Sequence, residues 1–569
     1  MEDTNSLIEQ RKAKLKSLES KGIFPFKNKF TPTESCQQAR ENYVEGREVS
    51  VAGRITAHRD MGKSMFIDVR DQTGRIQVYA QKNVIGDEQF GIFTHLDLAD
   101  FVGVKGTLFT TKTGEISIKL ASFTILAKSL RPPPGKWHGL EDTEIRYRQR
   151  YLDLMSNPEV KDVMLKRSAI IREVRSFFHG RGYVEVETPM MQAIPGGAAA
   201  QPFKTFHNAL GCEFYLRIAL ELYHKRLLVG GVDRLFEIGK NFRNEGLSRR
   251  HNPEFTMLEA YCAYGDYESM LETVQSLITT IAQNVLGTLK VCSPQNYNEA
   301  RSALDNAASF FEPPVPSDEI NAVQTAENPD LSLLHEGLLS LSKQVRELGA
   351  ATAAKKGLEL ISSAKSKGLT ITTQDGLILE ALQKCRDFRE IDLTAPWRRA
   401  KYKDLVREKA GADWFDVSPA ERRQRAHDLG AEIGKEYEDF EVTGAVFEKL
   451  IEPTLINPTF VTHLPKELVP LAKLTPDDPT TVEVFECCIN GQEISPGYTE
   501  QNDPIVQRER LEHQAGGEQH KLDEDFLVAL EHGMPPAGGI GIGIDRLCMM
   551  LLGQESIRDV ILFPQMKPK

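Results

Sequence analysis

Hydrophobic and polar positions divide the chain into short alternating stretches and longer stretches with helical spacing. From Val49 to about Leu126, apolar and polar residues alternate in five short runs, and this period of two predicts five strands. Glycines such as Gly74 and Gly114 separate the runs at expected turns. Five short strands within ~80 residues are typical of a small closed barrel of the OB type.

Helical spacing dominates elsewhere. The stretch Leu7–Ser20 has a basic face, which could lie along nucleic acid or simply face solvent. Most of 147–183 is expected to be helical, followed by a strand that stops at Pro189. An amphipathic helix is predicted for 268–290, and the Leu- and Ala-rich pattern of 293–390 indicates an inserted helical module.

These patterns predict an α+β protein. We expect a basic helical extension over 1–48, an OB-fold barrel over 49–129 and a stiff, proline-rich linker over 130–150. The remaining 151–569 would form a larger domain, with an antiparallel sheet flanked by helices and with 293–390 as an insertion. The insertion could be a structural appendage, a nucleic-acid contact or a docking site for another protein.

Composition narrows the class of protein. No run approaches ~18 consecutive apolar residues, so no membrane span is predicted. The eight cysteines contain no C-x-x-C pair, which argues against a disulfide scaffold and a cysteine zinc site. The first residues lack the pattern of a secretory signal. We therefore expect a reduced, cytoplasmic enzyme.

Charge is unevenly distributed along the chain. Residues 1–150 hold 24 Lys and Arg against 19 Asp and Glu, a net charge of 24 − 19 = +5, although the whole chain carries −11. The remaining residues therefore carry −11 − 5 = −16. A basic front joined to an acidic body is compatible with an N-terminal contact to a polyanion, and solvated surface charge is the alternative.

A polar segment over 236–261 is the sharpest chemical pattern. Its spacing predicts a strand, a basic loop and a second strand. On a strand, Arg243 and Glu245 share a face, and they would offer a guanidinium for a phosphate and a carboxylate for an exocyclic amine. His251 is singled out among the histidines because it lies in the basic loop. A half-buried hairpin with salt-bridged charges is the alternative interpretation.

The second predicted strand of this segment places three further side chains on one face. Phe255, Glu259 and Tyr261 follow each other at even spacing, so they point to the same side. The Phe255 ring could stack on a base, and the Glu259–Tyr261 pair could hold a cation. The same face would then serve a nucleotide and an ammonium group.

A glycine-rich strand near the C-terminus ends in Asp545-Arg546. The alternating glycines from Gly538 allow close approach of a ligand or a neighbouring strand. Arg546 is expected where the chain turns into a helix, so its charge adds to the anion preference of that helix start. The spacing is not G-x-G-x-x-G, which excludes a Rossmann fingerprint.

A third pattern is a predicted hairpin around Asn490-Gly491, which form a two-residue turn. This turn places Cys488 opposite Glu493, and Glu486 on the same face as the diagonal neighbour of Glu493. Two such carboxylates repel each other unless a cation lies between them. Mg²⁺ held by one or two carboxylates and nucleotide phosphates fits this pattern, and two solvated glutamates are the alternative.

The three segments together resemble class II aminoacyl-tRNA synthetases, and within that class the chain is similar to the bacterial-type lysyl-tRNA synthetase family. NFRNEG resembles motif 2, GIGIGIDRL resembles motif 3, and the helix before GYVEVETP resembles motif 1. Further similar segments include MGKSMFIDVRD, TKTGEISI, RYRQRYLDL and IRDVILFP, in the same order. The resemblance covers about 1–290 and 391–569, and it does not extend to 293–390.

The resemblance implies ATP-dependent ligation of L-lysine to tRNA(Lys) through a lysyl-adenylate, with release of AMP and pyrophosphate. No protein nucleophile is needed, in agreement with the absence of G-x-S-x-G or another convincing nucleophile–base pair. Arg243 and Arg546 would be catalytic, and Glu486 and Glu493 would hold Mg²⁺. The implied ATP-binding residues are Arg243, Glu245, His251, Asn252, Phe255, Glu486 and Arg546.

Two further sets of residues are implied by the resemblance. Positions that would bind lysine are Gly197, Glu221, Glu259, Tyr261, Tyr498 and Glu500. Positions in the barrel that would bind the tRNA anticodon are Arg59, Phe66, Gln77 and Glu115. A homodimer is expected from motif 1 alone, and neither a membrane nor DNA is expected as a partner.

Two departures from the family pattern concern the amino acid rather than ATP. Ser495-Pro496 replaces a segment that usually carries an asparagine, so an amide side chain and a backbone N–H are lost. Leu220 precedes Glu221 where a smaller residue or proline is common. Alternative functions are a ligase that transfers lysine or an analogue to a protein, and a tRNA-binding regulator without ligase activity.

Overall fold

The computed structural model has two compact units, Met1–Pro158 and Glu159–Lys569. The residues that the structure describes are 2–134, 140–198, 200–292, 294–311, 329–366, 373–515 and 522–568. The predicted linker therefore falls partly outside the described residues, as do parts of the predicted insertion. No helix among the described residues is long and apolar enough to cross a membrane.

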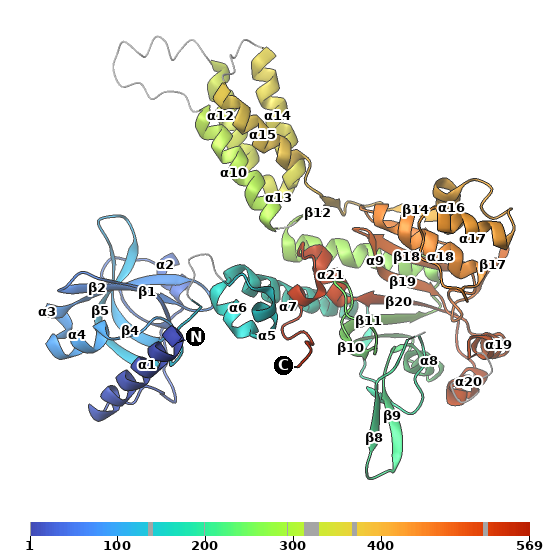
Figure 1. Ribbon diagram of the computed structural model, residues 1–569, viewed down its shortest axis with the longest axis horizontal. Coiled ribbons are helices and arrows are strands. Elements are labelled where there is room, and N and C mark those ends of the chain that lie inside the picture. The colour runs from blue at the N-terminus through green and yellow to red at the C-terminus, as the bar shows by residue number, and fades with distance from the viewer. Residues whose placement is uncertain are drawn as a thin grey trace. The chain divides into compact units, whose positions relative to one another are not determined.

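The first unit contains a closed five-stranded barrel, as the alternating pattern predicts (Figure 1). Its strand order is β1-β2-β3-β5-β4. The strands are β1 (Glu48–Asp60), β2 (Ser64–Arg70), β3 (Arg75–Gln81), β4 (Phe101–Thr110) and β5 (Ile116–Ala127). The helices of this unit are α1 (Glu2–Ser20), α2 (Cys36–Glu41), α3 (Lys82–Ile85), α4 (Asp87–Thr94), α5 (Thr143–Arg148) and α6 (Arg150–Ser156).

Alternation of side chains explains the barrel. On β2, Met65, Ile67 and Val69 are almost fully buried, whereas Phe66 between them is half-buried on the outer face. The same period of two repeats on β3 with Ile76 and Val78 inside. Because each strand contributes its inward residues to a single core, closure of the barrel removes apolar surface from water without leaving sheet edges.

The second unit is built on an eight-stranded sheet in the order β14-β15-β18-β19-β20-β11-β10-β6. All neighbours are antiparallel except the two outermost pairs, β14–β15 and β10–β6. The strands are β6 (Val184–Glu185), β10 (Arg234–Phe242), β11 (Glu254–Ala263), β14 (Arg398–Lys401), β15 (Thr459–Thr462), β18 (Val484–Ile489), β19 (Gln492–Thr499) and β20 (Ala537–Gly543).

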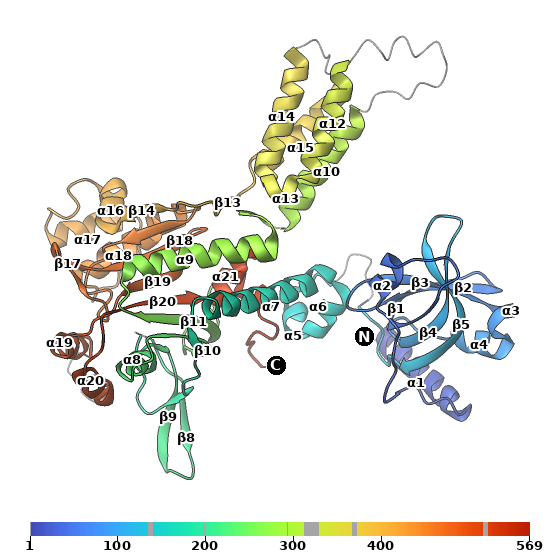
Figure 2. The ribbon, with the colours of Figure 1, turned by 180° about the vertical axis from the view of Figure 1, so that it is seen from behind.

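Two long helices cover one face of this sheet, α7 (Pro158–His179) and α9 (Tyr267–Ile281) (Figure 2). Their apolar faces pack on inward residues of the strands, including Leu258 and Ala260 of β11 and Ile540 and Ile542 of β20. The intervening residues of the same strands point to the opposite face. Those residues are the glycines of β20 and the polar and aromatic residues of β11, so the site forms on the opposite face.

Helices make up the described part of the predicted insertion, and they have a core of their own. Two short paired strands, β12 (Lys290–Val291) and β13 (Ile391–Asp392), bring its ends together. The helices are α10 (Pro294–Phe310), α12 (Pro329–Lys343), α13 (Val345–Leu348), α14 (Ala350–Ser366) and α15 (Thr373–Arg386).

Shorter elements complete the second unit. The strand expected before Pro189 is reduced to the two residues of β6. The remaining elements are β7 (Met191–Gln192), β8 (Lys204–His207), β9 (Cys212–Leu216), α8 (Glu221–Val229), α16 (Tyr402–Ala410), α17 (Pro419–Asp428), α18 (Asp439–Leu450), β16 (Leu474–Thr475), β17 (Asp478–Val482), α19 (Pro504–Ala515), α20 (Glu524–Glu531), α21 (Ile544–Leu551) and α22 (Ile557–Val560).

Candidate active site

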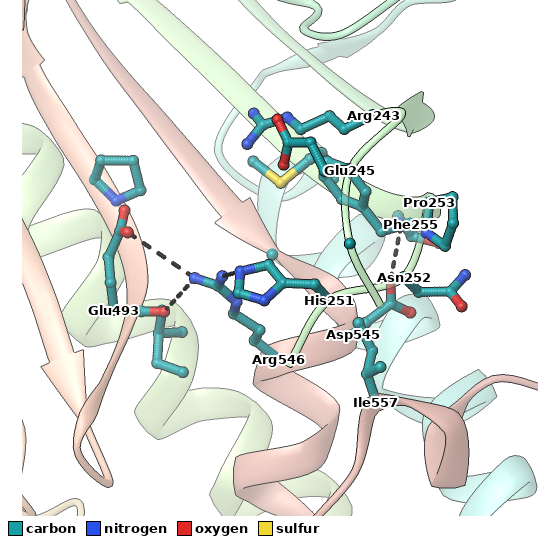
Figure 3. A pocket seen from close by; sticks show the side chains of 16 residues that line it. Arg243, Glu245, His251, Asn252, Pro253, Phe255, Glu493, Asp545, Arg546 and Ile557 are labelled. Atoms are coloured by element: carbon teal, nitrogen blue, oxygen red, sulfur yellow. Dashed lines mark hydrogen bonds and ion pairs between the residues drawn. The ribbon is translucent and has the colours of Figure 1, made fainter. Parts of the chain in front are cut away.

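A cavity of about 240 Å³ opens on the face of the sheet that α7 and α9 leave uncovered. Segments that are far apart in the sequence meet there, from the loop after β10, strands β11 and β19, and the start of α21 (Figure 3). Its lining residues include Arg243, Glu245, His251, Asn252, Phe255, Met257, Glu493, Pro496, Gly543, Asp545 and Arg546.

Arg243 lies in the loop rather than on a strand, because β10 ends at Phe242. The expectation that Arg243 and Glu245 share the face of a strand is therefore wrong, although both line the cavity. The backbone N–H of Arg243 donates to the Pro253 carbonyl oxygen at 2.9 Å, and its guanidinium lies 5.2 Å from the centroid of the Phe255 ring.

The surroundings of Arg243 suit an anion. Burial lowers the pKa of its guanidinium, and the opposing charges of Glu245 and Glu493 do not cancel that effect. Its buried Nε has no hydrogen-bond partner within the protein. A buried donor without a partner is costly, so a phosphate oxygen at this point would satisfy Arg243 and stabilise its charge.

Arg546 lies in the first turn of α21, as the sequence predicts, and it joins two sides of the cavity. Its Nη1 donates to the Glu493 carbonyl oxygen at 3.2 Å, and its Nη2 lies 3.2 Å from His251 Nε2 (Figure 3). On the other side of the ring, His251 Nδ1 lies 2.7 Å from Ser248 Oγ. His251 and Arg546 therefore lie together at one cavity, and their role in binding ATP stays a prediction.

Asn252 lines the cavity, but its amide group is engaged elsewhere. Asn252 Nδ2 donates to the Glu254 carbonyl oxygen and to Gln565 Oε1, both at 2.6 Å. Asp545 accepts the Thr256 N–H at 2.7 Å and pairs with Arg167 at 2.6 Å. These contacts fix the start of α21 against β11, which sets the position of Arg546.

Glu486 and Glu493 lie on one face of the hairpin β18–β19. The predicted register is confirmed, since Cys488 pairs with Glu493 and Ile489 with Gln492. A β-bulge at Cys487–Cys488 then brings Glu486 opposite Pro496. Glu493 lines the cavity, whereas Glu486 is not among its lining residues.

The electrostatics of this hairpin suit a cation. Burial and the neighbouring carboxylates of Glu493, Glu452 and Glu448 raise the pKa of Glu486 well above its ordinary value. Glu452 also accepts the Glu493 backbone N–H at 2.8 Å. Among the described residues, no group of three or more His, Cys, Asp or Glu is arranged to hold a metal ion. A cation here would therefore need phosphate oxygens to complete its coordination.

A cluster of buried acidic side chains, named the acidic pocket below, continues along β11, where Glu259 and Tyr261 follow Phe255 on the same face of the strand. The Tyr261 hydroxyl donates to Glu259 Oε2 at 2.9 Å, and the Leu220 N–H lies 3.3 Å from Glu259 Oε1. From β19, the Tyr498 hydroxyl donates to Glu221 at 2.7 Å. The predicted carboxylate and aromatic residues are thus brought together.

Lys225 is the main feature of this pocket that sequence reasoning missed. Its fully buried ammonium lies 2.8 Å from Glu221 Oε1 and 2.6 Å from Glu500 Oε2. Glu221 and Lys225 are one helical turn apart on α8, and that i, i+4 spacing is a signal that could have indicated the pair. Lys225 therefore offsets part of the negative charge of Glu221 and Glu500.

Glu500 is buried in a tight space. Burial raises the pKa of Glu500 to about 8; Lys225 opposes this shift, and Glu221 adds to it. Position 539 of β20, beside Glu500, must be a glycine, because a Cβ there would lie 2.0 Å from Glu500 Oε1 and 2.6 Å from the Tyr261 ring. The alternating glycines therefore leave room for the acidic pocket, in agreement with the prediction of a close approach.

Two of the remaining expected positions also border this pocket. Gly197 has a positive φ of +85°, and a Cβ there would lie 3.7 Å from that of Glu221. Leu220 is fully buried at the start of α8 and contributes only its backbone N–H. Pro496 lines the cavity, and Tyr498, two residues further along β19, contacts Glu221, so the departure at 495–496 lies between the cavity and the buried carboxylates.

The predicted anticodon residues gather on the outer face of the barrel. Arg59 pairs with Phe66 across β1–β2, and Gln77 pairs with Asp68 across β2–β3. The Arg59 guanidinium lies 3.2 Å from Asp68, and Ser117 Oγ donates to Gln77 Oε1 at 2.9 Å. Glu115 joins the same face through ion pairs to Arg40 at 2.9 Å and Arg75 at 3.2 Å.

Sequence reasoning missed two aromatic residues on this face. The Tyr79 ring stacks on Phe66 with 4.5 Å between ring centroids, and Phe109 lies 5.9 Å beyond Tyr79. Tyr79 follows Gln77 at a spacing of two, so strand alternation could have placed it there. Half-buried aromatic rings on the outer face, beside polar groups, suit stacking of unpaired bases.

Comparison with known proteins agrees with this geometry. A family model described as tRNA synthetases class II (D, K and N) matches residues 142–336 and 357–567. The chain belongs to the class II tRNA synthetases. A second model, an OB-fold nucleic-acid-binding domain of the tRNA anticodon type, matches residues 49–126 of this synthetase.

Curated relatives cover the whole synthetase. A lysine–tRNA ligase of Pelotomaculum thermopropionicum is 42% identical over 100% of this chain and 96% of its own length. The corresponding enzyme of Carboxydothermus hydrogenoformans is 41% identical over 100% of this chain and 99% of its own. The lysine–tRNA ligase of Staphylococcus saprophyticus is 39% identical over the full length of both chains.

Proposed function

We propose that this synthetase joins L-lysine to tRNA(Lys) in two steps, with ATP as the energy source. The observation that carries the proposal is that one face of β11 first lines the cavity and then enters the cluster of buried carboxylates. Phe255 and Met257 line a cavity with arginines for phosphates, and Glu259 and Tyr261 begin an acidic pocket for an ammonium group. A site that pairs an ammonium with carboxylates discriminates strongly against uncharged analogues.

The first step is attack by a lysine carboxylate oxygen on the α-phosphorus of ATP, with cleavage of the bond to pyrophosphate. Arg243 would hold the α-phosphate, since its unpartnered Nε and its position over Phe255 face the nucleotide cavity. Glu245 would accept from the adenine amine, and Phe255 would stack on the base. Arg546, oriented by His251, would hold the outer phosphates. Positioning and charge neutralisation carry this chemistry.

The second step transfers the lysyl group to a terminal ribose hydroxyl of tRNA and releases AMP. The hydroxyl oxygen attacks the adenylate carbonyl carbon, and the bond from that carbon to the phosphate oxygen breaks. Glu221, Glu259 and Glu500 would keep the lysyl ammonium groups fixed through both steps. The barrel residues Phe66 and Gln77 would stack on and read unpaired anticodon bases.

We also infer that Mg²⁺ binds at Glu486 and Glu493. The acidic surroundings of Glu486 and the place of Glu493 at the cavity wall fit a hard cation shared with phosphate oxygens. When bound, Mg²⁺ would supply charge neutralisation on the phosphates. A cytoplasmic homodimer completes the proposal, and sedimentation of the protein at the mass of a single 63.8 kDa chain would contradict the dimer.

The decisive experiment is ATP–pyrophosphate exchange with each of the twenty amino acids in turn. We expect Mg²⁺-dependent exchange with lysine, and a loss of about 100-fold or more in Arg243→Ala because its contacts form chiefly in the transition state. Arg226→Ala is the matched control and should retain exchange, because this half-buried arginine of α8 pairs with Asp523 and does not line the cavity. Exchange with a different amino acid, or with none, would overturn the proposal.

A further inference from the structure

A buried histidine that the mechanism above does not use lies directly behind the acidic pocket. His224 is on α8, its side chain is fully buried, and its ring packs edge-on against Tyr261 with 5.3 Å between centroids. His224 Nε2 lies 3.1 Å from Glu237 Oε2. Its other ring nitrogen, Nδ1, lies 3.6 Å from Glu259 Oε2 and has no hydrogen-bond partner.

Two carboxylates therefore flank one imidazole. A neutral imidazole has one N–H donor, so it can serve only one of these carboxylates, whereas an imidazolium can donate to both. Glu237 is held firmly on the far side, by Arg217 at 2.8 Å and by the Thr188 hydroxyl at 2.7 Å. Glu259 is the member of the pair that faces the acidic pocket.

We propose that His224 is a positioning residue for the amino-acid substrate: anchored on Glu237, it holds the Glu259 carboxylate in place against the substrate ammonium. This role rests on the proposed lysine-dependent activity. It assigns to His224 no contact with the substrate, because the ring is fully buried and contacts Glu259 and Tyr261. Loss of the Nδ1–H would leave two acceptors facing each other and would loosen Glu259.

The charges around His224 favour the imidazolium. Burial lowers the pKa of His224, but Glu237 and Glu259 outweigh that effect and raise it above its ordinary value. Glu237 of β10 and Glu259 of β11 face the ring, and Tyr261 of β11 packs against it. Glu237 is also paired with Arg217. Lys225, the next residue on α8, is paired with Glu221 and Glu500. Only Lys225 and Arg217 oppose a positive ring, and each is already paired with a carboxylate.

Two near-isosteric substitutions of His224 test the roles of its two ring nitrogens separately. An asparagine side chain can place an N–H near the position of Nδ1, facing Glu259, whereas a glutamine can place one near the position of Nε2, facing Glu237. We expect His224→Asn to keep the lysine KM of pyrophosphate exchange within about threefold of wild type at neutral pH, and His224→Gln to raise it about tenfold or more. The ATP KM and the kcat at saturating lysine should change little in both variants.

The pH dependence tests the charge state. Wild type should lose the advantage of its second N–H as pH rises through the raised pKa of His224, so the ratio of lysine KM in His224→Gln to that in wild type should fall between about pH 6 and about pH 9. His224→Asn does not titrate and should bind lysine better than wild type at the alkaline end. If the His224 ring only fills space, this ratio of KM values should not change with pH.

Several outcomes would overturn the inference. Equal effects of the two variants, a flat ratio, or a rise in ATP KM as large as that for lysine would each do so. If His224→Gln does not fold, the comparison of His224→Asn with wild type across pH decides alone. Absence of lysine-dependent exchange in wild type would instead overturn the proposed function.

Discussion

Arg546 Nη2 lies 3.2 Å from His251 Nε2, and this contact joins the start of α21 to the loop after β10. An arginine only donates hydrogen bonds, so His251 Nε2 must accept and its proton must lie on Nδ1, where it donates to Ser248 Oγ at 2.7 Å. Burial and the charge of Arg546 both lower the pKa of His251, which keeps the ring neutral. The histidine thereby aims the arginine into the cavity.

This contact predicts a graded effect of substitutions at His251. A glutamine can present its amide oxygen near the position of Nε2, whereas an alanine leaves Arg546 without an acceptor. We expect His251→Ala to lower kcat/KM for ATP in pyrophosphate exchange about tenfold, and His251→Gln to stay within about threefold of wild type. Equal losses in both variants would show that orientation of Arg546 is not the role of His251.

From the raised pKa of Glu500 we expect lysine binding to be coupled to proton release. Its pKa of about 8 means that the carboxyl group is largely protonated at neutral pH in the free enzyme, and only the ionised form attracts an ammonium. Lysine binding should therefore release close to one proton at about pH 7, and in His224→Asn, whose side chain at 224 does not titrate, lysine KM should fall as pH rises toward 8. Calorimetry in two buffers with different ionisation enthalpies measures the proton count.

The same titration has a consequence for stability. Because the folded-state pKa of Glu500 is raised above that of an unfolded glutamate, Glu500 favours the folded state at acid pH and this contribution is lost as pH rises to about 8.

His224→Asn serves as the control for the calorimetry of lysine binding, since it removes the other titrating group beside the buried carboxylates. Proton release that disappears in His224→Asn would assign the proton to the histidine.

Substitution of an aromatic residue of the barrel should weaken aminoacylation of tRNA but leave activation of the amino acid unchanged. Phe66→Leu removes a ring that stacks on Tyr79, and base stacking contributes about 1–3 kcal/mol per base, so the tRNA KM in aminoacylation should rise about tenfold. Phe66→Tyr keeps a ring and should retain a KM near wild type. Pyrophosphate exchange without tRNA should not change in either variant, and a parallel loss of exchange would contradict a specific RNA contact.

We expect that the insertion can be removed without loss of the lysine-dependent reaction. Lys290 pairs with Asp392 and Val291 with Ile391, so a two-residue Asn-Gly turn can join Val291 to Ile391 after removal of 292–390. The described helices of the insertion pack on their own core, and we expect lysine-dependent exchange in the shortened protein within about twofold of wild type. A folded but inactive shortened protein would show that the insertion contributes to the active site.

Local periodicity determined much of this protein from the sequence by itself. Alternation predicted the five barrel strands, the shared face of Phe255, Glu259 and Tyr261, and the glycine strand followed by a helix at Arg546. The Asn490-Gly491 turn predicted the pairing of Cys488 with Glu493. These features depend on backbone geometry over a few residues, so a single sequence suffices for them.

Only the tertiary structure decided which of these groups act together. Local spacing gives little indication of the bulge that sets Glu486 opposite Pro496, of the loop that carries Arg243, or of the approach of Glu500 to Lys225. Each arises where distant segments pack: 277 residues separate Tyr498 from Glu221. The protonation of such groups depends on burial and on neighbours from other strands, and both exist only once the sheet has assembled.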